Sequence, residues 1–176
     1  IAGNNKENVI IINKSGTLII RKKNKKKLKG QNTVVKLTHK SRIFLIEAKE
    51  GATVISKDKT DQSTIYLKTA SGGQIDLDIQ TEKATATANS GGVINLKGTT
   101  FSFDAIVKSG SIVKAYELNS SQTKVKASSG GSCKAYARDI FEANASLGGS
   151  IEVYGDPKTF NQVISLGGSI IETNND

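Results

Sequence analysis

A glycine corner followed by an alternating strand recurs along this chain from residue 71 onward. It is clearest in Ser90-Gly91-Gly92-Val93-Ile94. The last glycines of the copies, at 73, 92, 110, 131, 149 and 168, are separated by steps of 19, 18, 21, 18 and 19 residues. A regular period of this size is typical of solenoids, in which each repeat packs on its neighbours. We therefore predict an all-β chain that forms a right-handed parallel β-helix with coils of about 19 residues.

The glycines are expected to have a structural role, because a sharp bend between strands needs either a positive φ or a close backbone approach. The predicted corners contain Gly72, Gly73, Gly91, Gly92, Gly110, Gly130, Gly131, Gly148, Gly149, Gly167 and Gly168.

Three columns of apolar side chains are predicted to face the interior, because side chains alternate between faces along a strand and equivalent strands stack about 4.8 Å apart. The first follows the corners, the second precedes them, and the third is aromatic. They are Ile75, Ile94, Ile112, Cys133, Ile151 and Ile170; Ala88, Ala127, Ala145 and Ile164; and Phe103, Phe141 and Phe160.

The remainder of the chain is less regular, and we interpret residues 1–176 as one β-helical domain. Residues 1–60 would form irregular basic coils and residues 61–176 the regular repeats. Strands are predicted at 9–12, 17–20, 33–38 and 43–48, the first two forming either a hairpin or a first coil. Glu50-Gly51-Ala52 resembles a corner with Ala52 in the place of the second glycine.

Positive charge is concentrated near the N-terminus. Residues 1–60 carry 15 Lys and Arg against 4 Asp and Glu, a net +11, whereas residues 61–176 carry 10 against 12, a net −2. Much of the excess is a basic run of Arg21, Lys22, Lys23, Lys25, Lys26, Lys27 and Lys29. We expect an exposed loop that could bind polyanions through charge alone. No aromatic residues alternate with these lysines to stack on bases, so a dedicated nucleic-acid site is not expected.

Few residue types for catalysis are present. The chain has one cysteine and one histidine, His39, so no catalytic residue, cofactor or metal ion is predicted. Cys133 falls in a column of isoleucines and is expected to be a buried apolar side chain. The chain has no methionine, so residue 1 is not expected to be a translational start, and no signal peptide is expected within these residues. No apolar stretch of about 20 residues is present, so no membrane span is expected in them.

Asp76 and Asp78 are the strongest candidates for an enzyme. They share the outer face of one strand, where two carboxylates could serve a polysaccharide hydrolase or lyase or bind Ca²⁺. The neighbouring positions expected in the Asp76 column offer neither an acidic strip nor a basic partner: Asn95, Val113, Lys134, Glu152 and Ile171. Solvated surface carboxylates are therefore the preferred interpretation.

Tyr136 and Tyr154 each fall five residues after a corner, in adjacent predicted coils, with Tyr116 nearby. Exposed tyrosines stacked in this way could form a platform for sugars, or they could simply pack on one another across the sheet.

The motifs resemble the putative auto-transporter adhesin "head GIN" domain family of Gram-negative bacteria, a family of unknown function. The resemblance covers nearly the whole chain. It rests on Gly16-Thr17-Leu18-Ile19-Ile20, on the serial Ser-Gly-Gly-x-Ile corners, and on residues 149–157 followed by residues 165–170. The chain departs from the family pattern in two ways: the basic run at 21–29 is heavier than the pattern requires, and the usual first strand is missing. The resemblance implies a β-helical protein that is exported to the periplasm, outer membrane or cell surface, with a role in adhesion and no established catalytic residues.

The leading hypothesis is thus a non-enzymatic surface domain whose partners are glycans or other anionic surface components. The alternatives are a polysaccharide-active enzyme and a polyanion-binding module. Because a terminal coil leaves an unpaired strand edge, we also expect a cap or a homo-oligomer at one end, around Ile170-Ile171.

Overall fold

The computed structural model describes residues 9–23 and 33–173, which belong to two compact units, Ile1–Ser41 and Arg42–Asp176. The described residues form strands and turns only, so none of them lies in a helix that could cross a membrane.

The first unit contains an antiparallel hairpin of β1 (Val9–Lys14) and β2 (Thr17–Lys22). Its two-residue turn has positive φ at Ser15 (50°) and Gly16 (75°), the conformation that favours glycine and matches the twist of a hairpin. The sequence left open a hairpin or a first coil, and the structure shows the hairpin. The strand predicted at 33–38 is not formed, and its Val34 and Leu37 are exposed.

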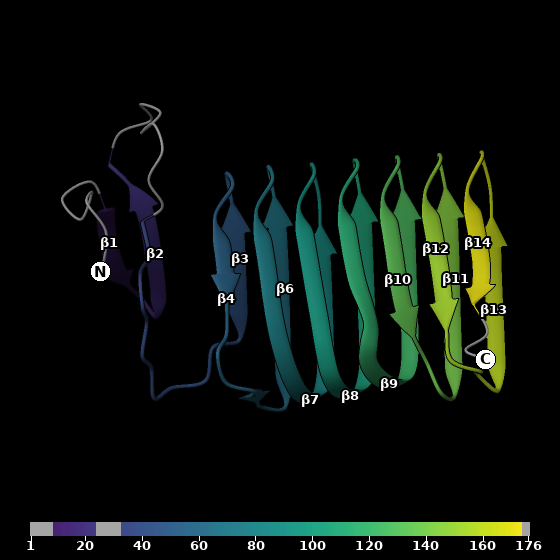
Figure 1. Cartoon of the computed structure of the whole chain (residues 1–176), viewed down its shortest axis with the longest axis horizontal. Helices are drawn as coiled ribbons and strands as arrows, with labels where there is room; N and C mark the ends of the chain where they lie inside the picture. The colour runs from purple at the N-terminus through teal and green to yellow at the C-terminus, as the bar shows by residue number, and fades with distance from the viewer. Residues whose placement is uncertain (1–8, 24–32, 174–176) are drawn as a thin grey trace. The chain divides into compact units, whose positions relative to one another are not determined.

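The second unit is a parallel β-solenoid, as predicted (Figure 1). All neighbours in its twelve-stranded sheet are parallel, with successive coils about 19 residues apart. The strands are β3 (Leu45–Lys49), β4 (Thr53–Ile55), β5 (Thr60–Asp61), β6 (Thr64–Ala70), β7 (Gln74–Ala88), β8 (Val93–Lys108), β9 (Ile112–Ser128), β10 (Ser132–Tyr136), β11 (Ile140–Ser146), β12 (Ser150–Tyr154), β13 (Thr159–Ile164) and β14 (Ser169–Thr173).

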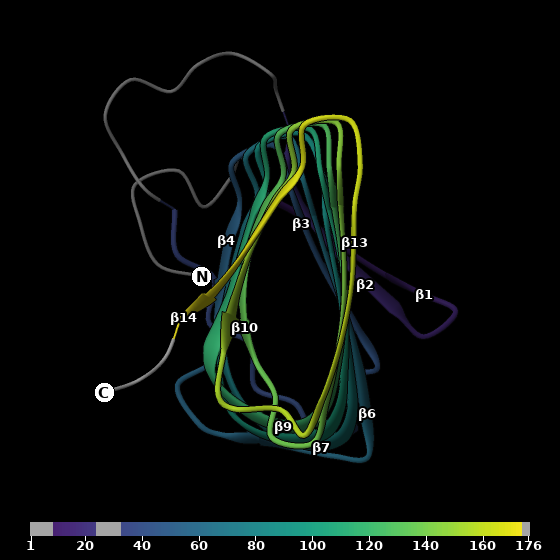
Figure 2. The same ribbon diagram turned by 90° about the vertical axis from the view of Figure 1, so that its right-hand side faces the viewer.

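Each coil is a flattened loop with two long sides (Figure 2). The front face consists of strands that follow a glycine corner: β4, the first parts of β7, β8 and β9, and then β10, β12 and β14. The rear face consists of strands that precede a corner. In Figure 2 the chain winds counter-clockwise as it approaches the viewer, so the solenoid is right-handed.

The glycine corners are tight turns that stack on one another. Both central residues have positive φ, as in Leu147 (50°) and Gly148 (71°). The next residue closes the turn, with Gly149 N–H donating to Ser146 O at 2.9 Å. That second glycine has another reason to be glycine: a Cβ on Gly149 would lie 2.3 Å from Ala127 O in the preceding coil. Ala52 is tolerated at the equivalent place because it belongs to the first coil of the described solenoid.

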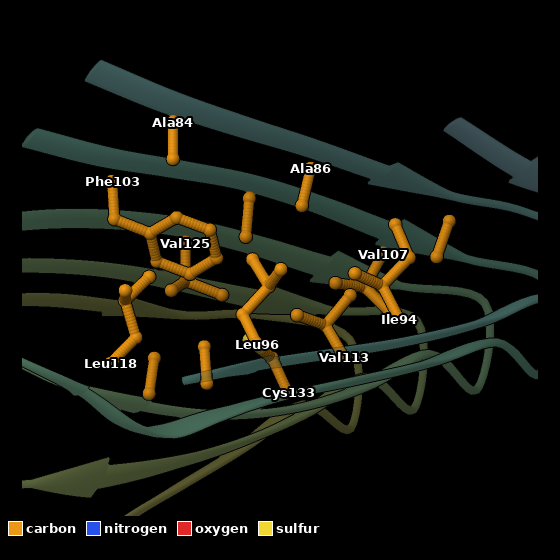
Figure 3. Packing of buried hydrophobic residues seen from close by; sticks show 14 of the residues in the cluster. Ala84, Ala86, Ile94, Leu96, Phe103, Val107, Val113, Leu118, Val125 and Cys133 are labelled. Carbon is orange, nitrogen blue, oxygen red and sulfur yellow. The ribbon is translucent and has the colours of Figure 1, made fainter. Parts of the chain in front are cut away.

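The interior columns are largely as predicted. Fully buried members include Ile94, Phe103 and Phe141, and Figure 3 shows Ile94, Val113 and Cys133 pointing into the same apolar space. The aromatic column is interrupted by Thr123, which is in register with Phe103 and Phe141.

The prediction that Ile112 faces inward was wrong. Ile112 is 37% exposed, and Val113 is the buried residue in register with Ile94 and Cys133. The cause is the corner at 109–111, where Ser111 rather than Gly110 occupies the second-glycine place. Counted on that place, the steps are 19, 19, 20, 18 and 19 residues, at 73, 92, 111, 131, 149 and 168.

Ile164 is also more exposed than predicted. It is in register with Ala145, but it is 51% exposed because it lies in the last described coil, where no further coil covers it. Other apolar side chains of that coil are exposed too: Val163, Leu166 and Ile171.

Candidate functional site

The front face is hollowed by a groove of about 500 Å³ over the middle coils. We call it the front groove. Its floor is formed by residues 76–78 of β7 and 95–97 of β8, which lie side by side in register. Residues 55–57, at and after the end of β4, bound it on one side, and Lys114, Tyr116 and Glu117 of β9 bound it on the other.

Polar side chains reach the floor because they alternate with buried leucines. Leu77 and Leu96 point into the core, so Asp76, Asp78, Asn95 and Lys97 point outward. Both oxygens of the Asp76 carboxylate accept hydrogen bonds, one from the amide of Gln74 at 2.7 Å and the other from the amide of Asn95. Asp76 therefore holds Asn95 in place across the two strands.

The wall on the β9 side results from an irregularity of the strand. Asn95 pairs with Lys114 and Lys97 pairs with Glu117, so β9 has one more residue than β8 between these two pairs. This is a β-bulge, which bends a strand and redirects its side chains. The extra residue accounts for the 20-residue step from Ser111 to Gly131, and it lies where Tyr116 borders the groove.

Tyr116 makes an aromatic pair at this border. Its ring centroid lies 5.5 Å from that of Tyr154, with the rings tilted by 35°, although β10 runs between their two strands. The adjacent Glu117 raises the pKa of the Tyr116 phenol, first through a hydrogen bond and then through its charge. The single O–H of Tyr116 is thus directed to Glu117, and the residue remains 41% exposed.

Of the two tyrosines proposed from the sequence, only Tyr154 belongs to this pair. Tyr136 is in register with Tyr154, but its ring packs over Gly155, where an added Cβ would lie 2.8 Å from the ring. Tyr136 borders a second, smaller pocket of about 360 Å³ at the bends opposite the corners. That pocket is lined by hydroxyl, amide and guanidinium groups, from Thr99, Thr100, Asn119, Ser120, Ser121 and Arg138.

The expected surroundings of Asp76 and Asp78 need correction. Lys97 Nζ lies 3.9 Å from Asp78 Oδ2, and Lys114, rather than Val113, is the next member of the Asp76–Asn95 column. Basic groups therefore do accompany the carboxylates. Lys97, Lys114, Tyr116 and Glu117 were not predicted as neighbours of the two carboxylates. Lys114, Tyr116 and Glu117 follow the misassigned corner at 109–111, so their positions in the coil were shifted in the prediction.

The remaining sequence candidates are placed as follows. Arg21 and Lys22 end β2 and Lys23 follows it, all three exposed, whereas Lys25, Lys26, Lys27 and Lys29 lie outside the described residues. Binding by the basic run stays a prediction.

Cys133 is fully buried, and burial raises the pKa of its thiol far above the ordinary value. A thiol in this state is not a nucleophile. Within residues 9–23 and 33–173, no three His, Cys, Asp or Glu side chains are grouped to hold a metal ion.

Comparisons with known proteins agree with this architecture. Residues 1–157 match the model of a family described as "Putative auto-transporter adhesin, head GIN domain". The structure is similar to the crystal structure of a putative adhesin from Bacteroides fragilis NCTC 9343, with a TM-score of 0.78 and 18% sequence identity. That likeness covers 96% of this chain and 77% of the other and shows a shared fold. No curated protein matches the chain in sequence.

Proposed function

This chain belongs to the putative auto-transporter adhesin, head GIN domain family, and from that premise we propose that it is a non-enzymatic adhesion domain of the cell envelope. The observation that carries the proposal is the unbroken stack of parallel coils, which holds its outer side chains on a rigid repetitive surface. Rigid scaffolds present binding groups without the entropic cost of ordering them at contact.

The chemistry of the front groove supports binding more than turnover. Asp76 accepts hydrogen bonds on both oxygens from neighbouring amides, and Asp78 faces the ammonium of Lys97. A general acid must deliver a proton to the scissile bond, whereas these carboxylates are already engaged with side chains of the same surface. We therefore assign Asp76 a positioning role towards Asn95 rather than a catalytic one.

Adhesion can be tested with beads that carry the folded chain. We expect such beads to adhere to surfaces coated with glycoproteins, and beads carrying the heat-unfolded chain to adhere no better than uncoated ones. Equal adhesion of folded and unfolded chain would count against a structured binding surface.

The enzymatic alternative is tested in parallel by incubating the chain with neutral and acidic polysaccharides. No products are expected. Turnover that disappears in Asp76→Asn or Asp78→Asn would replace the adhesion proposal with a polysaccharide hydrolase or lyase.

We further propose that the domain is exported and reaches the cell surface, as the family description suggests. Protease treatment of intact cells should then degrade the chain while sparing a cytoplasmic marker. A chain that is protected in intact cells but degraded in cells with a permeabilised outer membrane would lie in the periplasm instead.

A further inference from the structure

We propose that the front groove binds a neutral saccharide, with Tyr116 as the surface on which a sugar ring stacks. This inference rests on the proposed adhesive function and names the ligand class of its site. It is carried by three features of the groove: its balance of charge, its alternation of donors and acceptors, and the exposed tyrosine at its border.

The groove has no net charge, unlike the N-terminal part of the chain. Its lining contains three carboxylates and three ammonium groups: Asp76, Asp78 and Glu117 against Lys57, Lys97 and Lys114. The attraction of a polyanion to the three lysines would be offset by a repulsion of similar size from the three carboxylates. The charge pattern therefore favours a ligand that is neutral and forms hydrogen bonds of both kinds.

Donors and acceptors succeed one another along the solenoid axis. The column from Asp76 through Asn95 to Lys114 presents a carboxylate, an amide and an ammonium group on consecutive strands, about 4.8 Å apart. Hydroxyl groups both donate and accept hydrogen bonds. A polyhydroxylated chain laid across these strands can therefore donate to the remaining lone pairs of Asp76 and accept from the second amide hydrogen of Asn95 and from the ammonium of Lys114.

The tyrosine pair supplies the apolar surface that a sugar needs. One face of a pyranose ring carries C–H groups and packs on aromatic rings, and tyrosine combines such a ring with a polar tip. The Tyr116 ring packs against the Tyr154 ring, with the two ring centroids 5.5 Å apart, and Tyr116 lines the groove directly. Its single O–H is directed to Glu117, so its phenol oxygen is left to accept a hydrogen bond from a hydroxyl group of the ligand.

The proposal is tested with the full chain and defined probes. Cello-, xylo-, manno- and N-acetylchito-oligosaccharides are titrated by isothermal calorimetry, with heparin as the anionic probe. At least one neutral probe should bind, and its affinity should change little between low and high salt, since no net charge is neutralised.

The decisive variant is Tyr116→Ala, which should weaken binding about tenfold through loss of the stacked ring. Its matched control is Tyr66→Ala: Tyr66 is 44% exposed on β6 of the rear face, against 41% for Tyr116. Circular dichroism and thermal unfolding verify that both variants fold. Should Tyr116→Ala not fold, Lys97→Gln removes an exposed groove ammonium instead and should also weaken binding.

Three results would overturn the proposal: no neutral probe binds, Tyr116→Ala and Tyr66→Ala bind alike, or heparin binds best and is released by salt. The bead assay separates these failures from failure of the proposed function. Beads that adhere equally well with wild-type chain and with Tyr116→Ala would leave the adhesive function standing and exclude the groove. Beads that do not adhere at all would remove the function itself.

Discussion

Each coil of the solenoid turns twice, once at a glycine corner and once at the bend on the opposite side, and the two turns are built differently. The corners repeat one conformation: from Glu50-Gly51 to Leu166-Gly167, each has two successive residues of positive φ. The opposite bends differ from coil to coil. They include Gly98 with φ of 109°, the polar run Asn119-Ser120-Ser121, and the ionic cluster at Arg138-Asp139.

This difference separates what the architecture requires from what the surface can vary. At the corners the backbone of one coil touches the backbone of the next, so the constraint is steric and recurs at every corner that has a second glycine. At the bends a backbone contact of this kind occurs at single positions, Gly98 and Gly155, where a Cβ would lie 2.1 Å from Ile79 O and 2.5 Å from Ala137 O. Elsewhere in the bends the chain is held by side-chain hydrogen bonds and ion pairs, which can be exchanged. The smaller polar pocket lies at the bends, and the bulge that borders the front groove lies in the strand leading to one of them.

Gly149→Ala tests the steric constraint and should have the largest effect. The added Cβ would lie 2.3 Å from Ala127 O, so one of two adjacent coils must shift, at a cost of about 3 kcal/mol. The matched control is Gly148→Ala in the same corner. There a Cβ meets nothing within 4 Å but φ is +71°, so about 1–2 kcal/mol is expected. Urea unfolding of both variants gives the two values, and an equal loss of stability would show that the close approach at Gly149 costs no more than the positive φ at Gly148.

Ser111→Ala tests the corner where the second glycine is missing. The buried Ser111 hydroxyl donates to Ala88 O of the preceding coil at 2.7 Å, or to Lys108 O at 2.6 Å. The Ser111 hydroxyl thus donates to the carbonyl equivalent to Ala127 O, which at the Gly149 corner lies too close for a Cβ. Losing it should cost about 1–2 kcal/mol. Ser132→Ala, on the half-buried serine after the next corner, serves as the control and should cost less; a reversed order would contradict this role.

The same corner explains what could be read from the sequence and what could not. The period, the glycine pairs and most interior columns were predictable, because each follows from backbone conformation and strand alternation. The side-chain directions of residues 112–117 were not predictable, because either Gly110 or Ser111 can be aligned with the second glycine of the other corners. A shift of one residue exchanges the buried and exposed faces of the strand. The prediction therefore buried Ile112 instead of Val113.

The candidate site was predictable only in part for a related reason. Asp76 and Asp78 lie on one strand, so their shared face followed from alternation alone. Lys114 and Tyr116 reach the groove from another coil, beyond the ambiguous corner and beside a bulge. Counting from Ser111 gives a 20-residue step to Gly131, and this one extra residue was the available signal of the bulge.

Ser120→Ala changes the bend opposite the corners, and it should lower the stability less than the substitutions at the corners. The buried Ser120 hydroxyl contacts Thr123 and donates to Tyr136 O of the next coil. Thr123 also donates to Tyr136 O, at 2.7 Å, so this carbonyl keeps one partner in the variant and a cost of about 1 kcal/mol is expected. The more exposed Ser121 accepts from Arg138 at 2.8 Å and provides the control. If Ser120→Ala were as costly as Gly149→Ala, the bends would be as constrained as the corners.

Asp139→Asn should have the smallest effect at neutral pH, and that effect should depend on pH. Hydrogen bonds from Arg138 and Lys158, at 2.9 and 2.8 Å, lower the pKa of Asp139 to about 2 from an ordinary 3.8. Because the folded state binds this proton less readily than the unfolded state, the ion cluster stabilises the fold above about pH 4. This contribution is lost as the pH falls towards about 2.

The stability difference between wild type and Asp139→Asn, from urea unfolding at low salt, should therefore be constant above about pH 4 and vanish near pH 2. It should also vanish at every pH when Arg138→Gln and Lys158→Gln are combined, since the carboxylate then has no cationic partner in this cluster. A difference that persists at pH 2 would mean that Asp139 acts through the shape of the bend rather than its charge. The bends would then be constrained in the same way as the corners.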